Sequence, residues 1–257
     1  QRRQATLSGN TCGTFNAWGA IGGTSPTSTY TDATTADGFC YEYRLVTYDH
    51  VDNSRTIEPG KIVKVDRTAP TGTINANPTG PSRLTITLTG TSADTTTDVD
   101  HVVVKYAGPS TGTFAGCTGI LSWSCIWDTT QVADGTYTIT LEVTDLAGNR
   151  EAVPITRTIM VDNLPPVATF NSYTENTNGN YMHAIGVLGV TENTNGNYMH
   201  AIGSTMYFNP AGNGSFNVNI DANDAMSGVN RIEFPDFNLT GSNWSVPGTD
   251  SASPYTW

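Results

Sequence analysis

Residues 137–149 read YTITLEVTDLAGN, and after a short interval residues 158–166 read TIMVDNLPP. Residues 43–53 and 63–70 follow the same plan in different letters, as YRLVTYDHVDN and VKVDRTAP. Each copy has an alternating apolar and polar run, a polar turn, a second alternating run, and an aspartate shortly before a proline. Alternation of this kind predicts half-buried β-strands. A module ending that occurs twice indicates a tandem array of domains.

The distance between the two copies indicates the size of one domain. Asp145 follows Asp49 by 96 residues, and Asp162 follows Asp66 by the same 96, which is the length of an immunoglobulin-like sandwich. Helical periodicity is nearly absent, and the strands combine one apolar face with one Thr-rich face, as in a two-sheet sandwich. We therefore expect an all-β chain of tandem immunoglobulin-like β-sandwich domains.

The repeat divides the chain into three modules, at residues 1–66, 67–164 and 165–257. The middle module is expected to be complete, with room for about seven strands. The first module would hold only closing strands, and the last would lack them, so that both look incomplete. Two sources of the missing strands are open: neighbours in a longer polypeptide, or another copy of the chain, since an uncovered sheet edge accepts an added strand.

Composition excludes several classes of function. The chain has 12 Lys and Arg against 23 Asp and Glu, a net charge of −11 and a sequence pI near 4.5. Scattered Lys and Arg residues in an acidic chain argue against binding to nucleic acid. An acidic surface is better suited to binding divalent metal ions. No apolar run reaches the length of about 18 residues that a membrane span needs. The four histidines form no catalytic motif, so we expect no enzymatic activity.

Four cysteines occur as two local pairs, Cys12 with Cys40 and Cys117 with Cys125. Three disulfide pairings are possible, and the module boundaries favour the local one. Free thiols remain an alternative, whereas a four-sulfur metal site would need paired C-x-x-C spacing, which is absent. Disulfides would indicate an oxidising location outside the cytoplasm.

The last module contains an unchanged duplication, because residues 174–186 and 191–203 both read TENTNGNYMHAIG. The Asn-Gly pair in each copy is typical of a β-hairpin turn, so each copy is expected to form a turn followed by a strand. Two copies are too few to predict a solenoid.

Tryptophans and asparagines supply the remaining candidate sites. Trp123 and Trp127 alternate with polar positions and would share one strand face with Cys125, either as core residues or as an aromatic platform for sugars. Trp18 and Trp244 are expected in the core. Three N-x-S/T triplets could carry glycans in a secreted chain, or arise by chance in an Asn-rich segment; they begin at Asn213, Asn238 and Asn243.

In five segments the chain resembles the tandem bacterial Ig-like repeats of large prokaryotic cell-surface proteins and adhesins. These segments are residues 133–137 (ADGTY), 143–149 (VTDLAGN), 221–229 (DANDAMSGV) and the two exits at 65–70 and 161–166. The resemblance implies a non-catalytic, extracellular or cell-surface protein, namely a stalk, fibre or surface-layer segment. Its partners would be neighbouring Ig-like repeats of the same or another chain. The alternatives are a self-assembling filament subunit completed by strand exchange, and a module that binds a surface glycan or a host protein.

The resemblance also implies calcium, which such repeats often carry at domain junctions on aspartates of the turn and the exit. The candidate ligands are Asp145 and Asp162 at the second junction, with Asn149 or Asn163 as carbonyl donors, and Asp49 and Asp66 at the first. The turn at residues 49–53 departs from the Asp-x-Ala-Gly-Asn pattern. Calcium needs six to eight oxygen ligands, so two aspartates are not sufficient. The alternative is that these side chains only close turns by bonding their own backbone.

Overall fold

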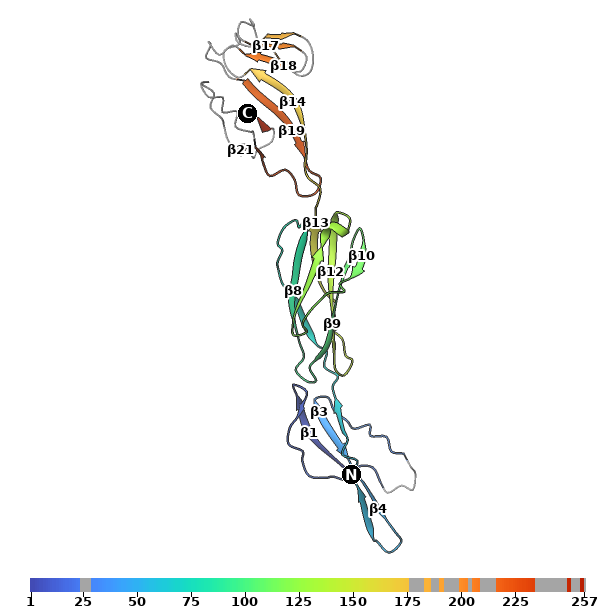
Figure 1. The fold of residues 1–257 in the computed structure, drawn as a ribbon. Helices are drawn as coiled ribbons and strands as arrows, with labels where there is room; N and C mark the ends of the chain where they lie inside the picture. Colours follow the sequence, from blue (N-terminus) through green and yellow to red (C-terminus); the bar gives the residue numbers. More distant parts are fainter. Residues whose placement is uncertain are drawn as a thin grey trace. The chain divides into compact units, whose positions relative to one another are not determined.

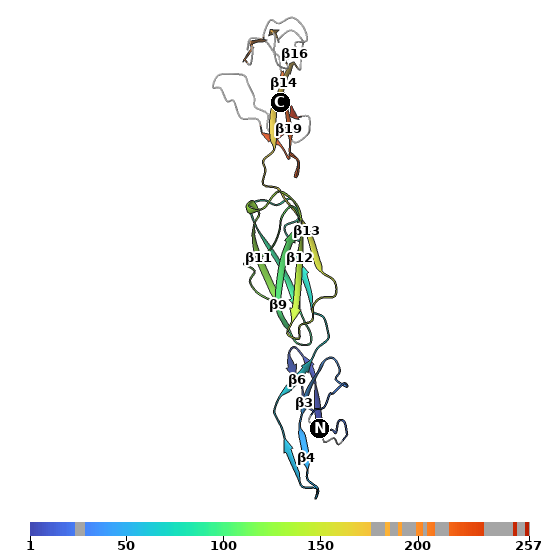
Figure 2. The same ribbon diagram turned by 90° about the vertical axis from the view of Figure 1, so that its right-hand side faces the viewer.

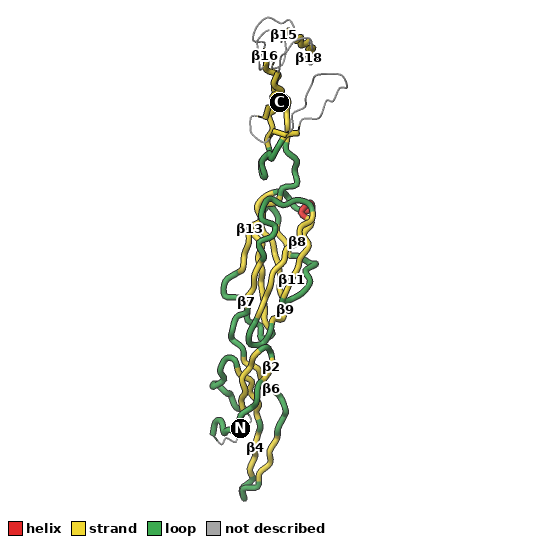
Figure 3. The backbone as a smooth tube through the Cα atoms, turned by 90° about the vertical axis from the view of Figure 1, so that its left-hand side faces the viewer, coloured by secondary structure: helices red, strands yellow, loops and turns green. Residues whose placement is uncertain are grey.

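The computed structural model describes residues 1–23, 29–175, 183–185, 190–191, 199–202, 205–208, 216–233, 249–250 and 255–256. The chain divides into two compact units, Gln1–Asn163 and Leu164–Trp257. Strands dominate both units, and the described helical structure is one short 3₁₀ turn, η1 (Thr129–Gln131), drawn red in Figure 3. The all-β expectation is confirmed. No helix in the described ranges is long and apolar enough to cross a membrane.

The first module contains one antiparallel sheet and a separate hairpin (Figure 1). The sheet has the order β2-β1-β3-β6, and the hairpin pairs β4 with β5. The strand bounds are β1 Arg2–Ser8, β2 Thr11–Cys12, β3 Phe39–Tyr43, β4 Leu45–Tyr48, β5 Ser54–Ile57 and β6 Ile62–Val65. Ala5, Leu7 and Cys40 form a small buried cluster beneath Cys12 and Phe15. Cys12 is bonded to Cys40, as the local pairing predicts.

The middle module is a sandwich of two antiparallel sheets, with the orders β10-β9-β12-β13 and β11-β8-β7 (Figure 2). Its strand bounds are β7 Thr71–Ile74, β8 Thr85–Ala93, β9 Val99–Ala107, β10 Thr111–Thr113, β11 Ser122–Asp128, β12 Gly135–Asp145 and β13 Ile155–Val161. Tyr137, Ile139, Leu141 and Val143 alternate along β12 and are fully buried. The period of two therefore fixes which face of the central strand supplies the core.

Strand β11 settles the alternative for its tryptophans. Trp123 and Trp127 are 1% and 4% exposed, and Cys125 between them is fully buried and bonded to Cys117. All three belong to the main core cluster. The core interpretation is confirmed, and the sugar platform at Trp123 is wrong, because these ring faces are covered by other side chains.

Two equivalent tyrosines show that the first and middle modules share one plan. Tyr41 and Tyr137, 96 residues apart, are 1% and 0% exposed. The Tyr41 hydroxyl accepts from the Ala36 N–H at 2.7 Å, and the Tyr137 hydroxyl donates to the Ala133 carbonyl at 2.6 Å. A buried tyrosine that bonds backbone a few residues upstream is the tyrosine corner of immunoglobulin-like sandwiches.

The described residues of the second unit form three sheets, with the orders β16-β14-β19-β22, β15-β17-β18 and β20-β21. The bounds are β14 Val167–Glu175, β15 His183–Ile185, β16 Val190–Thr191, β17 Met199–Ile202, β18 Thr205–Phe208, β19 Phe216–Asn223, β20 Ile232–Glu233, β21 Thr249–Asp250 and β22 Tyr255–Thr256. Long antiparallel pairing of β14 with β19 forms the centre of the largest sheet.

The duplicated segments pair with each other in parallel. His183 lies opposite His200 in the β15–β17 ladder, and Thr174 lies opposite Thr191 in the β14–β16 ladder. Each residue thus faces its own copy, as in successive coils of a β-solenoid. The sequence pattern, read as two separate turn-and-strand units, missed this arrangement. The Asn-Gly turns, Trp244 and the three N-x-S/T asparagines lie outside the described residues.

Candidate metal centre

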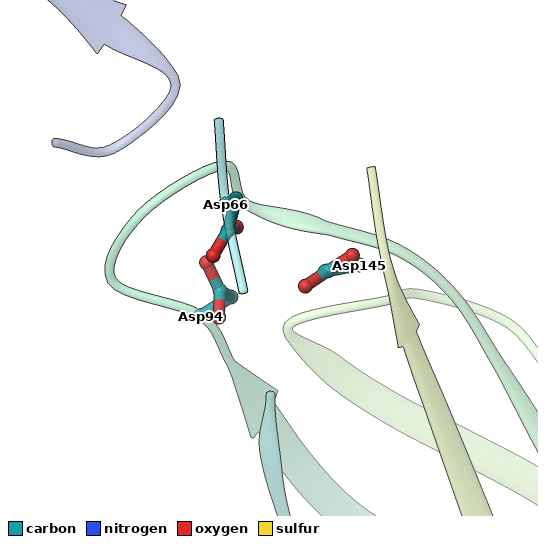
Figure 4. A group of neighbouring side chains, drawn as sticks. All are labelled: Asp66, Asp94 and Asp145. Carbon is teal, nitrogen blue, oxygen red and sulfur yellow. The ribbon is translucent and has the colours of Figure 1, made fainter. Parts of the chain in front are cut away.

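Three aspartates meet where the first module passes into the middle one. Each of Asp66, Asp94 and Asp145 offers one carboxylate oxygen, and these oxygens lie within 4.8 Å of one another. Asp66 follows β6, Asp94 follows β8, and Asp145 ends β12, so the cluster joins segments far apart in the sequence (Figure 4). Asp66 and Asp145 are buried, at 8% and 1% exposure, and Asp94 is half-buried.

Each carboxylate is fixed by the backbone that follows it. Asp145 Oδ1 accepts from the N–H of Ala147 at 2.9 Å and of Asn149 at 2.8 Å. Asp66 Oδ1 accepts from the N–H of Thr68 at 2.9 Å. These Asx-type turns hold the carboxylates before any ligand arrives.

Asp94 completes the cluster and leaves one oxygen unsatisfied. Its Oδ1 accepts from the N–H of Thr96 at 2.7 Å and of Thr97 at 2.8 Å. Its Oδ2 is buried and has no hydrogen-bond partner among the described residues. The hydroxyl of Thr97 donates to Asp66 Oδ2 at 2.5 Å, so the Asp94 loop also contacts the exit of the first module. Buried polar atoms normally have a partner, and a bound water or cation would supply one for this oxygen.

The donor set fits a calcium ion. Three carboxylates this close repel one another, and a hard divalent cation would neutralise the repulsion and bind the orphan oxygen. Carboxylate oxygens are the ligands that calcium prefers, and carbonyls or water would have to supply the rest of its six to eight positions. Asp66, Asp94 and Asp145 are the residues that would hold the ion.

The structure groups the predicted ligands differently from the sequence analysis. Asp145 lies with Asp66, whereas Asp162 follows Val161, which pairs with Gly135 at the other end of β12. The 11 residues of β12 span about 35 Å at roughly 3.3 Å per residue, so pairing Asp145 with Asp162 is wrong. Asp49 lies at the turn between β4 and β5, and its pairing with Asp66 is not observed among the described contacts.

The two asparagines brace turns through side-chain hydrogen bonds. Asn149 Nδ2 donates to the Asp66 carbonyl at 3.1 Å and to Asp145 Oδ2 at 2.8 Å, which ties the turn to the exit. Asn163 Oδ1 accepts from the Leu84 N–H at 2.9 Å and from the Thr129 hydroxyl at 3.2 Å. Asn163 therefore closes the far end of the middle module through bonds to Leu84 and Thr129.

Asp94 is the residue that sequence reasoning missed. A signal for it exists, because residues 94–99 (DTTTDV) parallel residues 224–229 (DAMSGV) in the third module. Asp224 Oδ1 accepts from the N–H groups of Met226, Ser227 and Gly228, so it forms the same kind of turn as Asp94. Comparing these two turns would have added Asp94 to the candidate ligands.

Trp18 departs from the expected core position. It is half-buried on the first module, and the guanidinium groups of Arg3 and Arg44 lie 4.7 and 4.5 Å from its ring centroid. Cation–π contacts of this kind stabilise an indole at the surface. The expectation of a core tryptophan is wrong here.

Comparison with known proteins gives weak structural and clear family similarities. No curated protein matches the chain. The endo-β-1,4-mannanase of Thermotoga petrophila is 17% identical over 42% of this chain, with a TM-score of 0.30, and the match spans only 22% of the mannanase. The fibronectin(III)-like modules of Clostridium thermocellum CbhA are 15% identical over 63% of this chain and 77% of theirs, with a TM-score of 0.31. These TM-scores are too low to support an argument.

The family similarities cover the middle of the chain. Residues 56–163 match the family described as bacterial Ig-like domain, and residues 121–236 match the bacterial Ig-like domain of group 3. Domains of this kind are structural and surface modules, generally without catalysis, and two internal disulfides indicate a location outside the cytoplasm. The chain is therefore a tandem array of bacterial Ig-like domains.

Proposed function

We propose that this chain is a stalk or fibre segment of an extracellular surface protein, in which calcium fixes the junction between its first and middle modules. The proposal is supported by the Ig-like domains, by a disulfide inside each of the two modules, and by the acidic cluster at their junction. A stalk holds its outer end at a distance only if consecutive modules do not bend freely, so the junction is where stiffness matters.

The observation that carries the proposal is that the three carboxylates come from two different modules. Asp66 belongs to the exit of the first module, whereas Asp94 and Asp145 belong to the middle module. An ion bound to all three would cross-link the two modules. Extracellular calcium modules bind with Kd of about 10⁻⁴–10⁻³ M, so millimolar calcium would stabilise the junction by about 1 kcal/mol.

Calorimetric titration of calcium into the full chain tests the proposal. We expect one site in the wild type and none in Asp94→Asn, which keeps the Oδ1 that caps Thr96 and Thr97 but removes the charge. The matched control is Asp49→Asn, which makes the same charge change in an exposed turn and should retain the site. Scattering with calcium and then with chelator should show a more flexible wild type in chelator. Equal calcium binding by Asp94→Asn would overturn the proposal.

One observation favours a second candidate, a filament subunit completed by a strand from another chain. The β4–β5 hairpin pairs with no third strand among the described residues, and Leu45, Tyr48 and Ile57 on it are 57%, 63% and 47% exposed. An unpaired apolar edge accepts strands. Sedimentation at rising concentration would show polymers if this candidate holds, and a monomer at every concentration would exclude it.

A further inference from the structure

A second contact between the first and middle modules lies beside the acidic cluster. The turn between β1 and β2 donates its N–H groups to the loop that presents Asp94. Gly9 N–H donates to the Thr95 carbonyl at 3.0 Å, and Asn10 N–H donates to the Thr96 carbonyl at 2.9 Å. Thr96 in turn donates its own N–H to Asp94 Oδ1. The Asp94 loop is therefore held between its own carboxylate and the first module.

The backbone conformation of Gly9 and Asn10 directs their N–H groups toward this loop. Both residues have positive φ, 51° and 58°, which is the requirement of a two-residue type I′ hairpin turn. The hairpin itself is short, since β1 and β2 pair only through Leu7 with Cys12 and Ser8 with Thr11. A ladder of two residue pairs is too short to hold a turn in place unaided.

Two links from the hairpin to the rest of the first module supply the missing constraint. The Cys12–Cys40 bridge ties β2 to β3, where Cys40 is fully buried. The ammonium of Lys64, on β6, donates hydrogen bonds to the Asn10 carbonyl and to Asn10 Oδ1, both at 2.6 Å. The turn is thereby fixed to two strands of the main sheet of the first module, one covalently and one by charge-assisted hydrogen bonds.

We propose that the Cys12–Cys40 bridge and Lys64 are positioning groups for the acidic cluster, acting through the Gly9–Asn10 turn on the Asp94 loop. None of them touches the carboxylates. We call the bridge and Lys64 together the brace. When the brace is loosened, the Asp94 loop is free to leave the position in which one Asp94 carboxylate oxygen lies within 4.8 Å of those of Asp66 and Asp145. The part of this inference that concerns calcium rests on the proposed function, and the part that concerns the loop does not.

Thermodynamic linkage gives the brace a redox consequence. If the bridge strengthens calcium binding, calcium must stabilise the bridge by the same factor. A dithiol reductant would transfer two electrons and two protons to the Cys12 and Cys40 sulfurs, forming two thiols, while the dithiol closes to its own cyclic disulfide. Bound calcium should therefore raise the dithiol concentration needed to open Cys12–Cys40, and leave Cys117–Cys125 unchanged.

The first test measures amide hydrogen exchange at Thr96 and Thr97 of the full chain in chelator. The variants are Lys64→Met and the double variant Cys12→Ser with Cys40→Ser. The controls are Lys61→Met, which removes an exposed ammonium of the same strand region, and Cys117→Ser with Cys125→Ser. We expect exchange about tenfold faster in the two brace variants. Should the double serine variant fail to fold, inserting two glycines between Gly9 and Asn10 replaces it. Unchanged exchange in folded brace variants would overturn the inference.

The second test repeats the comparison with calcium. Affinity should fall about tenfold in the brace variants and remain at the wild-type value in both controls. Faster exchange without any calcium binding by the wild type would overturn the proposed function and keep the brace. Normal calcium affinity in folded brace variants would overturn the role of the brace in the site.

Discussion

Asp49 and Asp145 close the same five-residue turn, but of the two only Asp145 belongs to a cluster of three carboxylates among the described residues. Each Oδ1 accepts from the N–H groups two and four residues on, and each Oδ2 accepts from the Nδ2 of the fifth residue, Asn53 or Asn149, at 2.8 Å. These bonds, that from the Asn53 side chain first, hold the pKa of Asp49 below its usual range. Turn chemistry therefore does not distinguish a cation ligand from a turn-former, whereas neighbouring carboxylates do.

Asp94→Asn should be more stable than the wild type in chelator, and calcium should narrow this difference by about 1 kcal/mol. In chelator, removing one of three mutually repelling charges should raise the free energy of unfolding by about 1–2 kcal/mol, after solvent screening of the half-buried Asp94. In millimolar calcium the variant should gain nothing, whereas the wild type gains about 1 kcal/mol. Thermal unfolding in the two buffers measures both effects. A variant less stable than the wild type in chelator would mean that Asp94 acts mainly through its hydrogen bonds.

Gly90→Ala should be among the most damaging single changes in the middle module. Gly90 lies on β8 where a Cβ would collide with the carbonyl of Thr73 on β7 and with the ring of Trp123. Neither the backbone nor a buried indole can move aside easily. We therefore expect the free energy of unfolding, measured in urea, to fall by about 3 kcal/mol or more. Gly116→Ala is the control, because a Cβ there meets nothing within 4 Å. Similar losses in both variants would contradict the steric explanation.

Trp127→Phe should cost much less than Trp127→Ala. The Trp127 ring stacks on Tyr106 at 5.3 Å and meets Tyr137 edge-on at 5.2 Å between centroids. Its indole N–H is buried without a partner among the described residues, so phenylalanine loses no hydrogen bond there. We expect about 3–5 kcal/mol for alanine and about 1–2 for phenylalanine. Equal losses would show that the indole shape itself is required.

The sequence predicts the features that depend on short-range pattern. Alternation at residues 137–143 fixes the buried face of β12, and alternation around Trp123 fixes the core face of β11. The disulfide partners follow because each pair lies within one module. These predictions succeed because strand period and covalent proximity are local properties.

The predictions that fail depend on which loops meet in space. The acidic cluster joins residues 66, 94 and 145 through loops at one end of the middle module, and antiparallel pairing sends Asp162 to the other end. Trp18 is an isolated aromatic residue outside any periodic run, and the two arginines that cover it come from β1 and the residue before β4. Contacts of this kind follow from tertiary packing, which spacing alone does not encode.

The first module should lose stability in acid through Asp32. Its carboxylate accepts from the Thr34 hydroxyl and N–H, and pairs with Arg2 at 2.8 Å, and these contacts hold its pKa far below the ordinary range. Because the folded pKa is depressed, the stabilisation is complete above the unfolded value of about 3.9 and is lost as the pH falls below it. Asp32→Asn should flatten this acid dependence. Urea midpoints against pH, read from Trp18 fluorescence in a variant that lacks the other tryptophans, measure it.

The first module should also lose stability in alkali, through Tyr43. Its hydroxyl donates to Asp32 Oδ2 at 2.9 Å, and burial, followed by this bond, raises the pKa of Tyr43 to about 12. The folded pKa is raised above the unfolded value of about 10. The contribution of Tyr43 to stability is therefore complete below a pH of about 10 and is lost as the pH rises toward the folded value. Tyr43→Phe should remove the alkaline loss and leave the acid loss in place. If both variants removed both losses, the two groups would titrate as one unit, and the bond between them would control each end of the profile.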